Sequence, residues 1–187
     1  EINDSKIVKT QGFDGNEGIC CKVNSKGIMN LNSVEVMAES NAALQAESGT
    51  ITVNRGKYSS KQGAAIATRY NSGSDLDLTM NGGTYQSDYD HTVANFGCYV
   101  DYSGRKCNIQ IHGSKFIGGQ LLWFHGEGAE TLTIDENTIF QSTGGTHDAV
   151  VVSYGKLIFN SGTIEVSGGS ERAALRTFER GEAIVND

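Results

Sequence analysis

The chain has 187 residues, which is enough for one domain with a substantial core. Its formal charge of −7, from 15 basic and 22 acidic residues, argues against nucleic acid or an anionic membrane surface as the main partner. There are 24 glycines and no proline. No apolar run approaches the roughly 18 residues of a membrane-spanning helix. We therefore predict neither nucleic-acid binding nor membrane insertion of this segment.

An apolar residue followed by a small polar residue recurs along the whole chain. Successive pairs lie 22 to 31 residues apart, and six of the eight polar residues are asparagine. In chain order the pairs are Ile2-Asn3, Leu31-Asn32, Val53-Asn54, Met80-Asn81, Ile111-His112, Ile134-Asp135, Phe159-Asn160 and Val185-Asn186. Another apolar residue stands two positions before seven of these pairs. This alternation indicates that a short strand ends at each pair.

Two further apolar segments follow each pair. An apolar or aromatic residue lies five positions after the anchor in six units, at Val36, Tyr58, Tyr85, Phe116, Ile139 and Ile164. A third apolar cluster falls at 18–23, 42–46, 64–68, 97–100, 121–124, 149–152 and 173–177. Three short strands in a variable repeat of about 25 residues are typical of a parallel β-solenoid. An antiparallel sandwich, the alternative, gives no reason for asparagine to return in register.

The sequence predicts an all-β fold, a right-handed parallel β-helix with three short strands per coil and about six coils. Asparagine tolerates the left-handed backbone of a sharp corner, and its amide can bond to an asparagine in the next coil. The residues expected to stack at one corner are Asn32, Asn54, Asn81, Asp135 and Asn160. The adjacent inward column should be Leu31, Val53, Met80, Ile111, Ile134 and Phe159. We expect 1–187 to be a single solenoid domain from a longer protein, because the chain begins in mid-pattern.

This pattern resembles the pectate-lyase-like right-handed parallel β-helix, in which an asparagine ladder lines one sharp turn. Stretches such as 62–85 and 148–164 are similar to bacterial surface and passenger-type adhesins. The resemblance implies an extracellular or cell-surface module that binds a glycan or a surface protein without catalysis. The same superfamily includes polysaccharide lyases and glycoside hydrolases, so an enzyme of that kind is the alternative.

Residues that could support catalysis are sparse. Acids are paired at Asp75 and Asp77 and at Asp88 and Asp90, and such pairs can hold calcium or act as acid and base. They are also ordinary in soluble loops, which is the interpretation adopted here. Motifs for a phosphate loop, a zinc protease or a serine nucleophile elbow are absent. We therefore predict no catalytic residue, no metal and no cofactor, and we interpret His112 as a corner residue.

The third strands offer a candidate binding face. In one phase they bury Leu44, Ile66, Leu122, Val150 and Leu175. The same phase displays Lys22, Gln45, Tyr99, Trp123, His125 and Arg176. Side chains of this kind at intervals of about 5 Å suit an extended glycan or peptide. The opposite phase buries Trp123 and removes the site, and the sequence leaves both phases open. Arg172, Arg176 and Arg180 alternate with glutamates, which indicates a solvated face.

The cysteines and the ends of the chain leave two further expectations. Cys98 and Cys107 flank a short excursion, where they could form a disulfide or remain buried thiols, and the sequence leaves both open. The spacing of the four cysteines does not match a zinc site. Terminal coils of a solenoid have unpaired strand edges. We therefore expect self-association through the ends at high concentration.

Overall fold

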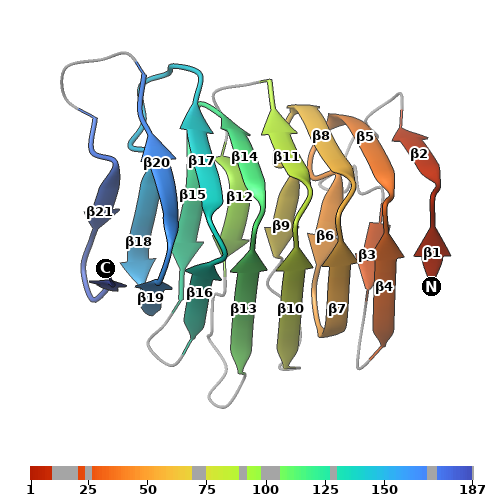
Figure 1. Cartoon of the computed structure of the whole chain (residues 1–187), viewed down its shortest axis with the longest axis horizontal. Helices are drawn as coiled ribbons and strands as arrows, with labels where there is room; N and C mark the ends of the chain where they lie inside the picture. Colours follow the sequence, from red (N-terminus) through yellow and green to blue (C-terminus); the bar gives the residue numbers. More distant parts are fainter. Residues whose placement is uncertain are drawn as a thin grey trace.

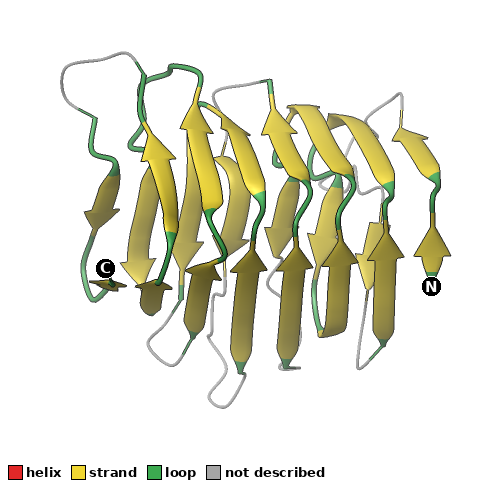
Figure 2. Cartoon of the chain, in the orientation of Figure 1, coloured by secondary structure: helices red, strands yellow, loops and turns green. Residues whose placement is uncertain are grey.

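The computed structural model describes residues 1–9, 21–23, 27–68, 75–88, 92–97, 106–126, 130–167 and 172–186. These residues form 22 strands, and none of them lies in a helix (Figures 1 and 2). The strands assemble into three parallel sheets of eight, seven and seven strands. Every strand pairs with strands one coil before or after it, so the predicted parallel β-solenoid is confirmed.

The three sheets, here called A, B and C, contain every third strand of the chain. Sheet A consists of β1 (Ile2–Asn3), β4 (Ile28–Asn32), β7 (Gly49–Asn54), β10 (Leu76–Asn81), β13 (Cys107–His112), β16 (Thr131–Asp135), β19 (Lys156–Phe159) and β22 (Glu182–Val185). Sheet B consists of β2 (Lys6–Lys9), β5 (Glu35–Ser40), β8 (Lys57–Gln62), β11 (Thr84–Ser87), β14 (Lys115–Gly118), β17 (Thr138–Ser142) and β20 (Gly162–Glu165). Sheet C consists of β3 (Cys21–Val23), β6 (Leu44–Ala46), β9 (Ile66–Thr68), β12 (Thr92–Gly97), β15 (Gln120–His125), β18 (Val150–Tyr154) and β21 (Leu175–Thr177).

Alternating residues of each strand point into the core between the sheets. In sheet A the predicted inward column is confirmed, and all six of its members are buried: Leu31, Val53, Met80, Ile111, Ile134 and Phe159. Burial of this apolar column removes hydrocarbon from water in every coil, which favours the stacked arrangement over separate strands. The register is fixed at the same time, because a slip of one residue would turn each inward side chain toward solvent.

Sheet B contributes a column of stacked aromatic rings to the core. The ring centroids are 5.2 Å apart between Tyr58 and Tyr85, 5.0 Å between Tyr85 and Phe116, and 4.8 Å between Phe116 and Phe140. All four side chains are fully buried. Burial, with a smaller contribution from Tyr58, raises the pKa of Tyr85 well above its usual value. The phenol of Tyr85 is therefore neutral at physiological pH.

Ile139 has the same spacing from its anchor residue as Tyr58, Tyr85 and Phe116, but it does not join this inward column. Phe140 pairs with Phe116 and fills the column, whereas Ile139 points outward and is 37% exposed. Asp135 pairs with His112 and Ile139 pairs with Lys115, so the corner after β16 contains one more residue between paired positions than the corner after β13. Its residues Glu136 and Asn137 both have a left-handed backbone, with φ of 53° and 59°. The extra residue moves the inward position on by one.

The asparagine ladder forms at the corner between sheets A and B. The side-chain amide of Asn32 donates to Asn3 at 2.7 Å, that of Asn54 to Asn32 at 2.8 Å, and that of Asn81 to Asn54 at 2.8 Å. Near the other end of the chain, the amide of Asn186 donates to Asn160 at 2.8 Å. Each of these bonds runs from a coil to the coil before it. Between the two segments, His112 bonds to Asp135 instead.

Replacing Asn81 with leucine should lower the free energy of unfolding by about 1 to 2 kcal/mol, because Asn54 loses its donor and the corner gains an apolar side chain. The change in urea midpoint, at constant m-value, measures this effect. Asn108→Leu, a half-buried position in β13 outside the ladder, is the matched control. Equal midpoints for the two variants would mean that the ladder does not stabilise the fold.

Candidate functional site

The outer face of sheet C carries a groove of about 820 Å³. Strands β15, β18 and β21 supply residues for it, together with the segment 145–148 that leads toward β18 and Phe178 after β21. The lining residues are Gln120, Trp123, Gly145, Thr146, His147, Asp148, Val151, Ser153, Arg172, Arg176 and Phe178. The volume lies within the range of sites that bind small molecules, and the lining mixes apolar, aromatic and charged groups.

The groove follows one row of outward positions across sheet C. Trp123 pairs with Val151, and Val151 pairs with Arg176. In the other direction the same row continues through Asn95, Ala67, Gln45 and Lys22. Four of the six predicted site residues, Lys22, Gln45, Trp123 and Arg176, therefore occupy this row. Trp123, Val151 and Arg176, at the C-terminal end of this row, line the groove.

The structure decides between the two phases of the third strands that the sequence left open. Leu44, Ile66, Leu122 and Val150 are completely buried, and Leu175 is partly buried against the core. Trp123 is consequently an outward residue and is half-buried. The alternative phase, in which Trp123 belongs to the core, is excluded. The cause is the pleat of β15, where Leu122 and Phe124 on either side of Trp123 both point inward and are fully buried.

The six predicted site residues do not all gather at the groove. Trp123 and Arg176 line it, and His125 lies beside Trp123 with a ring-centroid distance of 5.7 Å. The prediction that Gln45 is displayed is wrong, because this side chain is only 5% exposed. Its amide donates to Glu47 at 3.1 Å, so it has a polar partner within its own coil.

The other two predicted residues, Lys22 and Tyr99, are not tested by the structure. The backbone of Lys22 lies in β3 beside Gln45, and its side chain is outside the described part of the molecule. Tyr99 is outside the described residues. The described strand of this coil is Thr92–Gly97, which includes only the first residue of the predicted cluster at 97–100, and Asn95 occupies that coil's place in the row. Burial does not alternate along β12, because Val93 and Gly97 are buried like Ala94 and Phe96, so a period of two could not locate this strand.

Trp123 is held in position by polar and aromatic neighbours. Its indole Nε1–H donates to the Ser153 hydroxyl at 3.0 Å. On its other side the ring meets His125 edge-on, and His125 in turn meets Tyr154 edge-on at 4.9 Å between ring centroids. The single tryptophan of the chain is therefore fixed by a bond to β18 rather than free to rotate. A fixed aromatic surface loses little conformational entropy when a ligand packs on it.

An ion pair lies next to this tryptophan. The guanidinium Nε of Arg176 donates to Asp148 Oδ2 at 3.0 Å, and Arg176 also lies over the Phe178 ring at 5.6 Å from its centroid. Asp148 Oδ1 accepts the backbone N–H of Ala173 at 2.7 Å. The side chain of Asp148 is 12% exposed and that of Arg176 is 42% exposed. The pair therefore combines a fixed anion with a cation that still faces solvent.

Arg172 holds the segments around the groove together. Its guanidinium donates to the carbonyl oxygens of Gly119 at 2.8 Å and Ser167 at 3.3 Å, to the Ser142 hydroxyl at 3.1 Å, and to the carbonyl of His147. The sequence indicated a solvated face for this arginine, and that prediction is wrong. Its acceptors lie 5 to 53 residues away in the chain, so no local pattern could reveal them.

Asp75 and Asp77, two of the acids considered in the sequence, take no part in the groove. Asp75 and Asp77 are exposed, and Asp75 accepts the backbone N–H of Lys106. Asp90 and Cys98 are outside the described residues. Cys107 is buried at the start of β13, and neither a disulfide with Cys98 nor a pair of buried thiols is tested by the described residues.

The architecture defines the chain as a parallel β-solenoid protein. Comparison of the sequence with protein-family models, curated proteins and solved structures gives no match. Among the described residues, no helix is long and apolar enough to cross a membrane. The assignment of function therefore depends on the groove itself and on the sequence resemblance.

Proposed function

We propose that the chain is a non-catalytic β-helix module that binds a glycan in the groove on sheet C. The observation that carries this proposal is Trp123, a half-buried indole fixed by Ser153 in a groove of about 820 Å³. An indole offers an apolar surface on which a sugar ring can stack. The neighbouring carboxylate and guanidinium of Asp148 and Arg176 supply an acceptor and donors for sugar hydroxyls.

A glycan suits this position better than a peptide strand does. Peptides that extend a sheet need an edge with unpaired backbone groups. The groove lies instead on the face of sheet C, where β15 and β18 each pair with strands on both sides. A ligand here must be recognised through side chains, as a sugar chain is. The sequence also predicted a protein as an alternative ligand, and the binding experiment distinguishes a protein from a glycan.

The contacts of Asp148 favour binding over catalysis. One carboxylate oxygen accepts a backbone N–H and the other accepts from Arg176, which leaves this acid poorly placed to take a proton from a substrate. The specific observation that favours a polysaccharide lyase or hydrolase is the presence of an acid and two arginines in one groove. An extracellular or cell-surface location is part of the proposal and is supported by the resemblance to surface β-helices.

Because Trp123 is the only tryptophan, its fluorescence reports on this groove directly. We expect titration with a panel of neutral and acidic oligosaccharides to change the emission for at least one class. Trp123→Ala should weaken binding of that glycan, measured by calorimetry, by about 1 to 3 kcal/mol. Ile139→Ala, at an exposed position of sheet B, should leave the affinity unchanged.

Three results would contradict the proposal. The first is a fluorescence response to none of the glycans, together with binding of a protein in the same groove. The second is equal affinity in Trp123→Ala and the wild type. The third is the appearance of unsaturated uronate products, followed by their ultraviolet absorbance, which would favour the lyase instead. A near-native circular dichroism spectrum of Trp123→Ala separates loss of binding from loss of the fold.

A further inference from the structure

The corner ladder changes its chemistry at two consecutive coils. His112 stands in register with Asn81 in the coil before it and with Asp135 in the coil after it. Six other coils carry asparagine at the equivalent position, and side-chain amide hydrogen bonds connect asparagines of neighbouring coils. A histidine and an aspartate are thus the exceptions, and they are adjacent. At these two coils histidine and aspartate stand in place of neutral asparagine amides. They provide an imidazole nitrogen and a carboxylate, both of which can coordinate a metal ion.

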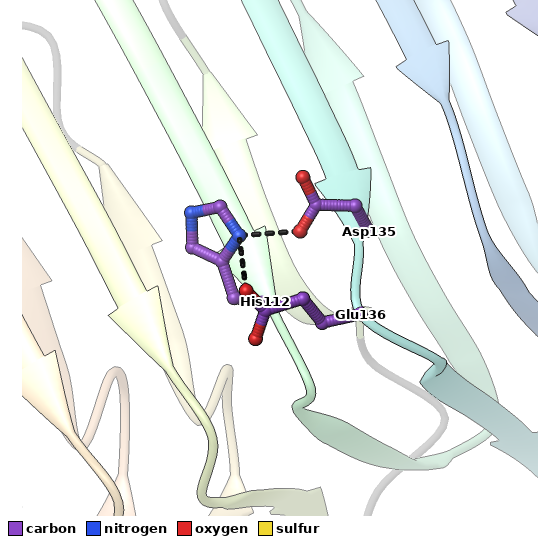
Figure 3. A group of neighbouring side chains, drawn as sticks. All are labelled: His112, Asp135 and Glu136. Carbon is purple, nitrogen blue, oxygen red and sulfur yellow. Dashed lines mark hydrogen bonds and ion pairs between the residues drawn. The ribbon is translucent and has the colours of Figure 1, made fainter.

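Glu136 adds a second carboxylate to this corner, as Figure 3 shows. The Nδ1 atom of His112 bonds to Asp135 Oδ1 and lies 4.0 Å from Glu136 Oε1. Both carboxylates therefore face the same ring nitrogen. One nitrogen can donate only one proton, so His112 can form a full hydrogen bond to only one of the two carboxylates, and water is left to solvate the other. Two carboxylates in one place also repel each other.

The three donor atoms have the reach that a metal ion requires. They lie within 4.8 Å of one another. Metal–ligand bonds of about 2.0 to 2.2 Å place the donors of a tetrahedral site about 3.3 Å apart, so side-chain rotations suffice and the coils need not separate. The Glu136 side chain is 72% exposed and can move, whereas those of His112 and Asp135 are 20% and 28% exposed and are held by the ladder corner.

We propose that His112, Asp135 and Glu136 bind a divalent first-row transition ion, with Zn²⁺ as its representative. An imidazole nitrogen selects such ions over Mg²⁺ and Ca²⁺, which prefer oxygen ligands alone. Two carboxylates match the charge of the ion, and water completes the coordination. The ion would connect β13 with the corner after β16, so its binding stabilises the folded solenoid. This site is separate from the groove on sheet C and does not depend on the function proposed for it.

Equilibrium dialysis against Zn²⁺, combined with thermal unfolding, tests the proposal. The informative variant is His112→Asn, because it restores the residue found at the other ladder corners and should fold. We expect the wild type to bind one more equivalent of Zn²⁺ than this variant does, and to gain in Tm where the variant does not. Glu136→Gln should weaken binding at this site at least about tenfold, since it replaces an anionic ligand with a neutral amide.

His147→Asn is the matched control, because His147 is an exposed histidine in the groove on sheet C. It should bind the same number of Zn²⁺ ions, with the same affinity, as the wild type. The proposal is overturned if the wild type takes up no Zn²⁺, or if His112→Asn retains the full number of bound ions. Unchanged affinity in Glu136→Gln would also overturn it, because the two remaining side chains alone would then account for the binding.

Discussion

Replacing Phe116 with alanine should lower the free energy of unfolding by about 3 to 5 kcal/mol. The ring is fully buried between Tyr85 and Phe140, at centroid distances of 5.0 and 4.8 Å. Its removal loses apolar burial and two stacked contacts, each worth about 0.5 to 1.5 kcal/mol beyond the buried area. The rings on both sides are held by their own coils, so the cavity left behind cannot close fully.

Urea unfolding followed by circular dichroism measures this effect, and Ile139→Ala is its control. Ile139 lies in the strand next to Phe116 but is 37% exposed, so its truncation should cost much less than that of Phe116. Similar losses in the two variants would contradict the assignment of Phe140 and not Ile139 to the inward column. The comparison therefore also tests the one-residue register shift after Asp135.

The second large effect is expected at Gly49, the first residue of β7. Its φ is +89°, and a Cβ atom there would lie 2.3 Å from the carbonyl oxygen of Gly27 in the preceding coil. Gly49→Ala should therefore combine the cost of a left-handed alanine with a clash against backbone, and lower the free energy of unfolding by about 2 to 4 kcal/mol. Relief of the clash would require β4 and β7 to move apart, which breaks their pairing.

Gly82→Ala separates the two contributions. Gly82 is also left-handed, with φ of +77°, but its nearest neighbour for a Cβ atom is the Arg55 side chain at 3.7 Å. This variant should lose only about 1 to 2 kcal/mol, which is the cost of the backbone conformation alone. Thermal unfolding of the two variants side by side provides the measurement. If they are equally stable, the approach of Gly49 to Gly27 relaxes at no cost.

The repeating parts of the fold could be predicted because each coil repeats the same physical requirement. The inward column of sheet A and the bonded ladder at Asn32, Asn54 and Asn81 follow from an apolar residue and an asparagine in register. Prediction failed where one coil departs from the rest. The longer corner after Asp135 moved the inward position to Phe140, and the strand before the 97–100 cluster begins at Thr92.

The groove could be predicted only in part, for a reason of the same kind. Trp123 and Arg176 occupy regular outward positions of strands, so periodicity located them. Asp148 and Arg172 lie in connecting segments, and their partners at Ala173 and Gly119 come from other coils. Their positions depend on loop conformation, which residue spacing does not determine. The meeting of His112 with Glu136 likewise depends on the longer corner that the sequence pattern did not reveal.

The stacking direction of the coils also determines how the molecule would bear tension. Its termini lie at opposite ends of the solenoid, and the strands run across the line that joins them (Figure 1). Backbone hydrogen bonds between coils therefore lie along that line. A force applied to the two ends would break the inter-coil hydrogen bonds of a terminal coil one after another. The bonds of the next coil would break only after that coil had separated. Each coil that peels away would release a length set by the 22 to 31 residues between stacked positions, so the solenoid would lengthen in steps at a nearly constant force.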